Sequence, residues 1–141
     1  MFDRGADQGS RAEGGTFAED LPYDCPPSSA VECDERLAYR FLKSSPATME
    51  SFHSHAKLGK RKPKDVPECF WASCSLIDID RKDILESRRK IPKFKNKPVA
   101  VIQLDCQSGM IKSSNSGHVD FWMYSSFNPL AAIKSVEGVD P

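Results

Sequence analysis

The stretch PVAVIQL, residues 98–104, is the clearest strand in this chain of 141 residues, and it decides the class of fold. A proline precedes the apolar run, and a Ser108-Gly109 turn after it leads into Met110-Ile111. A third run, from His118 to Tyr124, alternates between two kinds of side chain, as a half-buried strand does. Strands that follow one another with no helix between them favour an antiparallel sheet.

Upstream of this region, strand and helix patterns alternate. The residues from Arg36 to Leu42 predict a first strand, and residues 70–77 predict a second strand that is buried on both faces. Helical spacing runs from Ser45-Pro46 to Gly59 and again over 81–90, up to Pro92. Residues 128–133 fit either a last short helix or the start of a closing edge strand. The order predicts an α+β fold: a single small domain with a mostly antiparallel, curved or split sheet and short helices.

Charge divides the chain into an acidic start and a basic middle. The first 35 residues contain nine Asp/Glu against two Arg, a net charge of −7, and show no helical or alternating period. This composition is typical of disorder, so we expect a disordered acidic N-terminal segment at 1–34 ahead of an α+β domain at 35–141. Residues 36–97 carry sixteen Lys/Arg against seven Asp/Glu, a net +9 that suits an anionic partner.

The five cysteines and the apolar runs bear on location. No apolar window is long enough to cross a bilayer, and no apolar signal-peptide core lies near Met1. An odd number of cysteines without an export signal favours reduced thiols over a disulfide framework. These observations predict a cytoplasmic protein with no membrane partner.

Polar or ionisable side chains interrupt three of the apolar strand patterns. Arg40 lies in the first strand, Ser73 and Ser75 in the second, and His118 and Asp120 in the third. Burying such groups is costly unless each is paired or used. An arginine suits a phosphate, a serine hydroxyl can orient a ribose, and a carboxylate can stabilise positive charge on a sugar. The five residues therefore form one candidate site for a nucleotide-like ligand.

In their order, the three segments resemble those of the ADP-ribosyltransferase superfamily. In that family an early basic strand residue, a Ser-x-Ser strand and a later acidic residue line a split-sheet cleft that holds nicotinamide adenine dinucleotide (NAD). The resemblance implies that Arg40 holds the phosphates of NAD and that Ser73 and Ser75 orient the ribose. Asp120, with His118, would act at the reacting sugar carbon. Asp120 stands where the family usually has glutamate, and His118 stands where it has glutamate or glutamine.

The resemblance implies a nucleotide-binding domain that is an ADP-ribosyltransferase-like enzyme, with NAD as its substrate. The structural alternative gives the same side chains no ligand. In that case the hydroxyls of Ser73 and Ser75 bond neighbouring backbone, and Arg40 pairs with an acid at the surface.

A non-enzymatic alternative rests on two basic loops, 57–64 and 81–97. The first begins at Lys57 and ends at Lys64, and the second begins at Arg81 and ends at Lys97. These loops could bind nucleic acid through its phosphates, with stacking on the nearby rings of Phe70, Trp71 and Phe94. A protein partner would instead bind the face that carries Trp122 and Tyr124, because amphipathic aromatic rings are common at interfaces.

Two further kinds of site receive little support from the sequence. Four potential zinc ligands lie within 22 residues, but their spacing matches no standard zinc motif: His53, His55, Cys69 and Cys74. A cysteine nucleophile activated by His118 has no favouring local sequence either. We therefore expect no metal.

Overall fold

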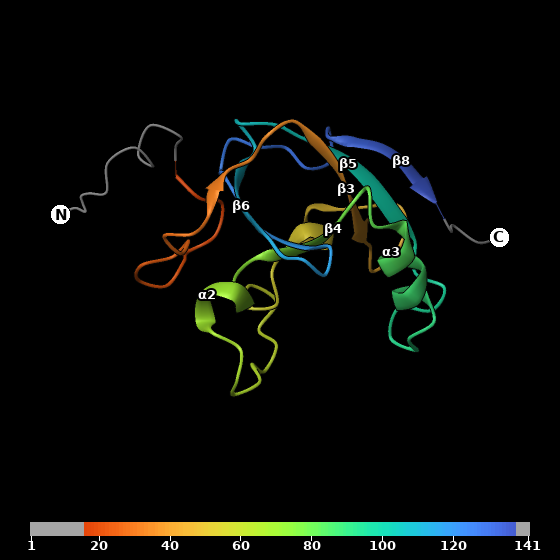
Figure 1. Cartoon of the computed structure of the whole chain (residues 1–141), viewed down its shortest axis with the longest axis horizontal. Coiled ribbons are helices and arrows are strands. Elements are labelled where there is room, and N and C mark those ends of the chain that lie inside the picture. The colour runs from red at the N-terminus through yellow and green to blue at the C-terminus, as the bar shows by residue number, and fades with distance from the viewer. Residues whose placement is uncertain (1–15, 138–141) are drawn as a thin grey trace.

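The protein folds around one antiparallel sheet, described by a computed structural model over residues 16–137 (Figure 1). Seven strands of this part of the chain join in the order β2-β6-β7-β4-β3-β5-β8, and every neighbouring pair is antiparallel. The strands are β2 (Val31–Glu32), β3 (Arg36–Phe41), β4 (Cys74–Asp78), β5 (Val99–Leu104), β6 (Gly109–Ser113), β7 (His118–Met123) and β8 (Ile133–Glu137). The predicted small, mostly antiparallel domain is confirmed, although the helices are so few that α+β describes it only loosely.

Within residues 16–137, three short helical segments accompany the sheet. They are the 3-10 helix η1 (Met49–Phe52) and the α-helices α2 (Glu68–Trp71) and α3 (Lys82–Arg89). Only α3 matches the sequence prediction closely. In Figure 1, α2 and α3 lie at separate places on the same side of the curved sheet.

The predicted helix over 45–59 is wrong, because only η1 forms there. Thr48 precedes it in an extended conformation and donates its backbone N–H to Ser51 Oγ at 2.9 Å. His53 at the other end is extended again, with a ψ of 145°, so the chain leaves the helix after one turn. The polar sequence that follows forms turns instead of a second helical turn.

The predicted strand over 70–77 is wrong in its first half. Phe70 and Trp71 belong to α2, which Pro67 precedes, and the strand begins only at Cys74. Both aromatic rings of the helix pack against other rings. Phe70 lies 5.8 Å from Trp122, and Trp71 lies 4.5 Å from His55, measured between ring centroids. Tertiary packing of large rings thus overrides their β propensity. At the C-terminus, the edge-strand alternative holds, because β8 pairs with β5.

The two faces of the sheet carry different layers. The main core lies on one face and includes Ala38, Leu76 and Val119, all at most 1% exposed. The alternation of strand side chains sends Tyr39, Ile77 and His118, which are cross-strand neighbours, to the opposite face. Leu85 of α3 covers one part of that opposite face, where it packs in a cluster with Tyr39, Ile77 and Val101.

Residues 16–34 belong to the same domain, contrary to the expected boundary at 35. Phe17 forms a bridge with Tyr124 and packs against its ring at 5.3 Å, and β2 pairs with β6. This segment covers Trp122 and Tyr124, which are each only 1% exposed. The proposed protein-binding face at these two aromatics is therefore wrong. Residues 1–15, the rest of the expected acidic segment, lie outside the described residues.

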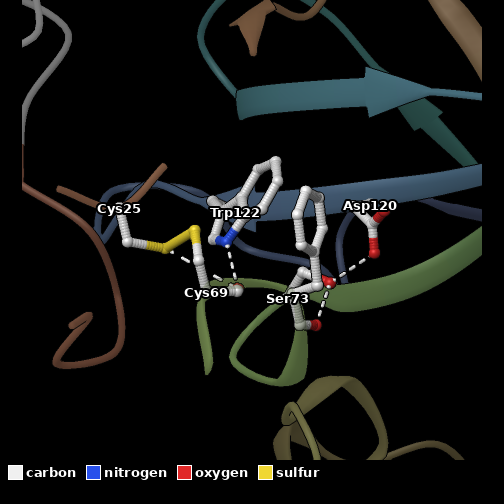
Figure 2. The surroundings of a disulfide bond; sticks show 6 residues. Cys25, Cys69, Ser73, Asp120 and Trp122 are labelled. Carbon is white, nitrogen blue, oxygen red and sulfur yellow. Dashed lines mark hydrogen bonds between the residues drawn. A yellow bond between two sulfur atoms is a disulfide. The ribbon is translucent and has the colours of Figure 1, made fainter. Parts of the chain in front are cut away.

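A disulfide joins the N-terminal segment to α2. Cys25 and Cys69 are bonded across 44 positions of sequence, and Trp122 Nε1 donates to the carbonyl of Cys69 at 3.0 Å (Figure 2). The expectation of reduced thiols is therefore wrong for these two cysteines. Cys33, Cys74 and Cys106 are free. Because disulfides persist in oxidising compartments, the cysteines no longer support the predicted cytoplasmic location.

Over residues 16–137, no helix combines the length and the apolar character needed to span a bilayer.

Candidate functional site

A cleft of about 680 Å³ opens beside β3 and β4, and its lining includes consecutive residues of both strands, among them Tyr39, Arg40, Leu76 and Ile77. Two further segments border the cleft. One is the loop that contains His53, His55 and Lys60, and the other is the stretch that contains Lys93 and Phe94. Ligand pockets generally have volumes of a few hundred to about 1,000 Å³, so the cleft is large enough for a nucleotide.

Four of the five predicted site residues line this one cleft. Arg40 comes from β3, Ser73 and Ser75 from β4 and the turn before it, and His118 from β7. These three strands are adjacent in the sheet, in the order β7-β4-β3. The segments thus meet in space, although they are up to 78 positions apart in sequence, as Arg40 and His118 are. Asp120 does not line the cleft and instead contacts residues that do.

The sheet splits at Arg40. Strands β3 and β4 pair only through Ala38 with Asp78 and Tyr39 with Ile77, whereas β3 and β5 pair over six residues. Beyond Tyr39 the two strands no longer pair, so the carbonyl of Ser75 has no backbone partner in β3. Arg40 Nη1 donates to that carbonyl at 3.0 Å, so a side chain takes the place of the missing ladder hydrogen bond.

The Arg40 guanidinium also holds η1 in place. Its Nε donates to the carbonyl of Ser51 at 3.0 Å, and Nη2 donates to that of His53 at 3.4 Å. All three acceptors are neutral, and no carboxylate of residues 16–137 lies within ion-pair distance. The predicted structural alternative, an ion pair with an acid at the surface, is therefore wrong. Two of the five guanidinium N–H groups remain beyond these bonds.

Asp120 connects Ser73 with His118. Its Oδ1 lies 2.8 Å from Ser73 Oγ and 3.1 Å from His118 Nε2 (Figure 2 shows the serine contact). Ser73 Oγ is also 2.8 Å from the carbonyl of Phe70, and its single proton can bond fully to only one of these acceptors at a time. The carboxylate therefore lies behind the imidazole and orients it toward the cleft. Ser75 Oγ, by contrast, makes no hydrogen bond within the described residues.

Positive charge dominates the lining of the cleft. Six basic side chains face it against one acidic residue, Glu50, and all three histidines of the chain line it too: Arg40, Lys43, Lys60, Arg88, Lys93 and Lys97, with His53, His55 and His118. A concave surface with one sign of charge concentrates ligands of the opposite sign. The cleft is thus suited to an anion that carries more than one charge.

His55 is a site residue that the sequence suggested only as a zinc ligand. Burial lowers its pKa below the usual 6.5, and the nearby charges of Lys60, Lys93 and Arg40 lower that pKa further. Its ring packs against Trp71 at 4.5 Å, and its buried Nδ1 has no hydrogen-bond partner within residues 16–137. The cleft therefore holds a neutral imidazole among cations. The only sequence signal was its position at the start of a basic loop.

An aromatic pair forms part of the lining. Phe41 and Phe94 stack with centroids 4.5 Å apart, and Lys93 Nζ lies 5.2 Å from the Phe94 centroid. Flat rings beside cations provide both stacking surface and charge for a ligand with a heterocyclic base.

The structure contradicts the zinc set and argues against Cys74, one of the two cysteines considered as a nucleophile. Cys69 is consumed by the disulfide, and no group of three potential ligands forms among the described residues. Cys74 is fully buried, which raises the pKa of its thiol above the ordinary value. A protonated, buried thiol is inert as a nucleophile.

Comparisons of the chain with protein-family models, with curated proteins and with solved structures found no significant match.

Proposed function

We propose that the cleft binds NAD and that the protein is an ADP-ribosyltransferase-like enzyme. The observation that carries the proposal is the meeting of Arg40, Ser75 and His118 in one cationic cleft where the sheet splits between β3 and β4. The sequence resemblance calls for these three segments on the walls of a split-sheet cleft, and adjacent strands supply them.

The lining suits a dinucleotide in shape and charge. The pyrophosphate of NAD carries negative charge, for which Arg40, Lys93 and Lys97 offer cations. The stacked rings of Phe41 and Phe94 offer an apolar wall for a base, and the Ser75 hydroxyl is available for a ribose. These features fit each part of the ligand with a group of matching chemistry.

The proposed roles follow from where the side chains lie. Bound NAD supplies an activated glycosidic bond, whose carbon accepts a nucleophile as nicotinamide leaves with the bonding electron pair. His118 lines the cleft and accepts the proton that the attacking N–H or O–H group loses. Asp120 orients that imidazole, a positioning role that its contact with Ser73 reinforces. Arg40 holds phosphate through the N–H groups not used by backbone.

Calorimetric titration with NAD tests binding, and release of nicotinamide tests turnover. Ser75→Ala removes a hydroxyl that makes no hydrogen bond within residues 16–137, so it should weaken NAD binding without loss of stability. Asp120→Asn should lower the rate of nicotinamide release and leave the NAD dissociation constant nearly unchanged. Lys134→Ala, in exposed edge strand β8, is the control and should alter neither. Absence of heat and of thermal stabilisation at millimolar-scale NAD would refute the proposal.

A further inference from the structure

The cleft lies between two basic segments whose charge exceeds what a dinucleotide needs. Segments 53–64 and 88–97 together contain eleven Lys/Arg and no Asp/Glu. Each contributes to the lining of the cleft, the first through His55 and Lys60 and the second through Arg88, Lys93 and Lys97. Two segments 24 positions apart in sequence thus form two cationic rims around one opening.

Most of these cations have no anionic partner. Lys62 is used internally, since its Nζ donates to the carbonyls of Pro63 and Val66, and Arg89 pairs with Glu137 at 3.5 Å. The other nine make no ion pair within residues 16–137: Lys57, Lys60, Arg61, Lys64, Arg88, Lys90, Lys93, Lys95 and Lys97. Like charges so close together repel one another, and a bound polyanion relieves that repulsion.

We propose that these two rims bind single-stranded nucleic acid, with one unpaired base entering the cleft. The inference goes beyond NAD binding and names a macromolecular partner. A single strand repeats a phosphate and a flat base, which matches cations that flank a cleft with aromatic walls. In a duplex the bases are stacked inside and cannot reach Phe94 at the cleft unless one of them is flipped out.

The groups that line the cleft distinguish between two kinds of anionic partner, a nucleic acid and an acidic protein. Carboxylates of an acidic segment would satisfy the rim lysines but offer nothing to the stacked pair of Phe41 and Phe94. Every base has a π-face that can stack on an aromatic side chain, and such stacking stabilises a bound single strand whatever its sequence. The combination of both features in one site favours the nucleic acid.

The test is fluorescence anisotropy of the full chain with a labelled single-stranded oligonucleotide, in the absence of NAD and over a range of salt. Single-strand affinity falls with salt at a slope of about −0.7 per phosphate contacted. Lys93→Ala/Lys97→Ala on one rim and Lys60→Ala/Lys64→Ala on the other should each reduce that slope by up to about 1.4 and weaken binding severalfold. The charge-matched control is Lys82→Ala/Lys134→Ala, whose exposed side chains lie outside the cleft lining and which should leave the slope unchanged.

Four results would count against the inference, and three of them would overturn it entirely. The first is that the oligonucleotide does not bind at low salt, and the second is that the rim and control variants lose the same amount of affinity. The third is that polyglutamate competes for binding as effectively as the unlabelled single strand. Tighter binding of the matching duplex would contradict the role of an unpaired base. Since NAD is absent from this assay, failure here leaves the calorimetric test of NAD unaffected, and failure of NAD to bind leaves this assay unaffected.

Discussion

Arg40 of β3 donates from Nη1 to the carbonyl of Ser75 in β4 at 3.0 Å, at the point where the two strands stop pairing. The same guanidinium bonds the carbonyls of Ser51 and His53. A split between neighbouring strands normally exposes backbone groups that must find other partners. Here one side chain satisfies three carbonyls and places a full positive charge at the cleft, so the stability of the fold and the proposed ligand binding involve the same residue.

Replacing Arg40 with methionine should destabilise the protein by about 2 kcal/mol or more, because three partly buried carbonyls lose a charged donor. Arg40→Lys keeps the charge but cannot reach three acceptors with fixed geometry, so it should recover only part of the loss. Urea unfolding measures the free energy of unfolding of both variants. Lys43→Met, at an exposed position on the same cleft, serves as the control. Equal stability of Arg40→Met and Lys43→Met would contradict the stabilising role of the Arg40 hydrogen bonds.

His55 should make stability depend on pH. Its pKa in the folded protein lies below the 6.5 of an unperturbed histidine because of burial and the cations Lys60, Lys93 and Arg40. As pH falls through 6.5, the unfolded chain binds the proton first, so stability is lost until the folded pKa is reached. Urea unfolding at about pH 7.5 and about pH 5.5 should show a smaller difference for His55→Gln than for the unchanged protein. An unaltered difference would argue against a neutral His55.

Thiol reactivity should distinguish the three free cysteines. Burial raises the pKa of Cys33 to about 12, and burial also raises the pKa of Cys74, whereas Cys106 is exposed. Because the thiolate is the reactive form, Ellman's reagent should modify one thiol in the native protein and two more only after unfolding. Cys106→Ser should abolish the native reaction. Rapid modification of a second thiol would show that the core around Cys33 or Cys74 opens readily.

The Cys25–Cys69 disulfide should contribute substantially to stability. It closes a loop over 44 positions, for which restriction of the unfolded chain corresponds to about 4 kcal/mol in the chain-entropy model. The double variant Cys25→Ser/Cys69→Ser should lower the urea midpoint by a similar amount to reduction of the unchanged protein. Cys33→Ser is unsuitable as a control because that thiol is buried, so exposed Cys106→Ser is used. A reduced protein as stable as the oxidised one would contradict the prediction.

Gly109 at the start of β6 should tolerate no side chain. A Cβ there would lie 2.9 Å from Phe121 Cε1 and 3.0 Å from Met123 Cα, and it would collide with the carbonyl of Trp122. Since backbone cannot move aside cheaply, Gly109→Ala should cost about 1–3 kcal/mol. The comparison is Gly59→Ala, where φ is +74° but no atom lies within 4 Å of the added methyl group. A smaller loss at Gly109 than at Gly59 would show that β6 and β7 readjust.

Local sequence signals predicted the elements that depend on short-range patterns. The Ser108-Gly109 turn marked the boundary between β5 and β6, which pair with different strands, and alternation located β3 and β7 almost to the residue. Helix α3 followed from the pattern that Pro92 terminates. The same signals failed at Phe70 and Trp71, whose rings pack from a helix against partners distant in sequence. Periodicity cannot represent such contacts.

The sequence by itself determined the antiparallel strand framework and the residue types of the candidate site, because alternation, turns and unusual polar residues are local properties. Only the tertiary structure decided that Cys25 bonds Cys69, that residues 16–34 cover Trp122, and that Arg40 bridges a split in the sheet. It also decided that Asp120 lies behind His118 instead of in the cleft. Each of these facts joins positions far apart in the chain, and the free energy that selects such contacts comes from burial and hydrogen bonding in the assembled fold.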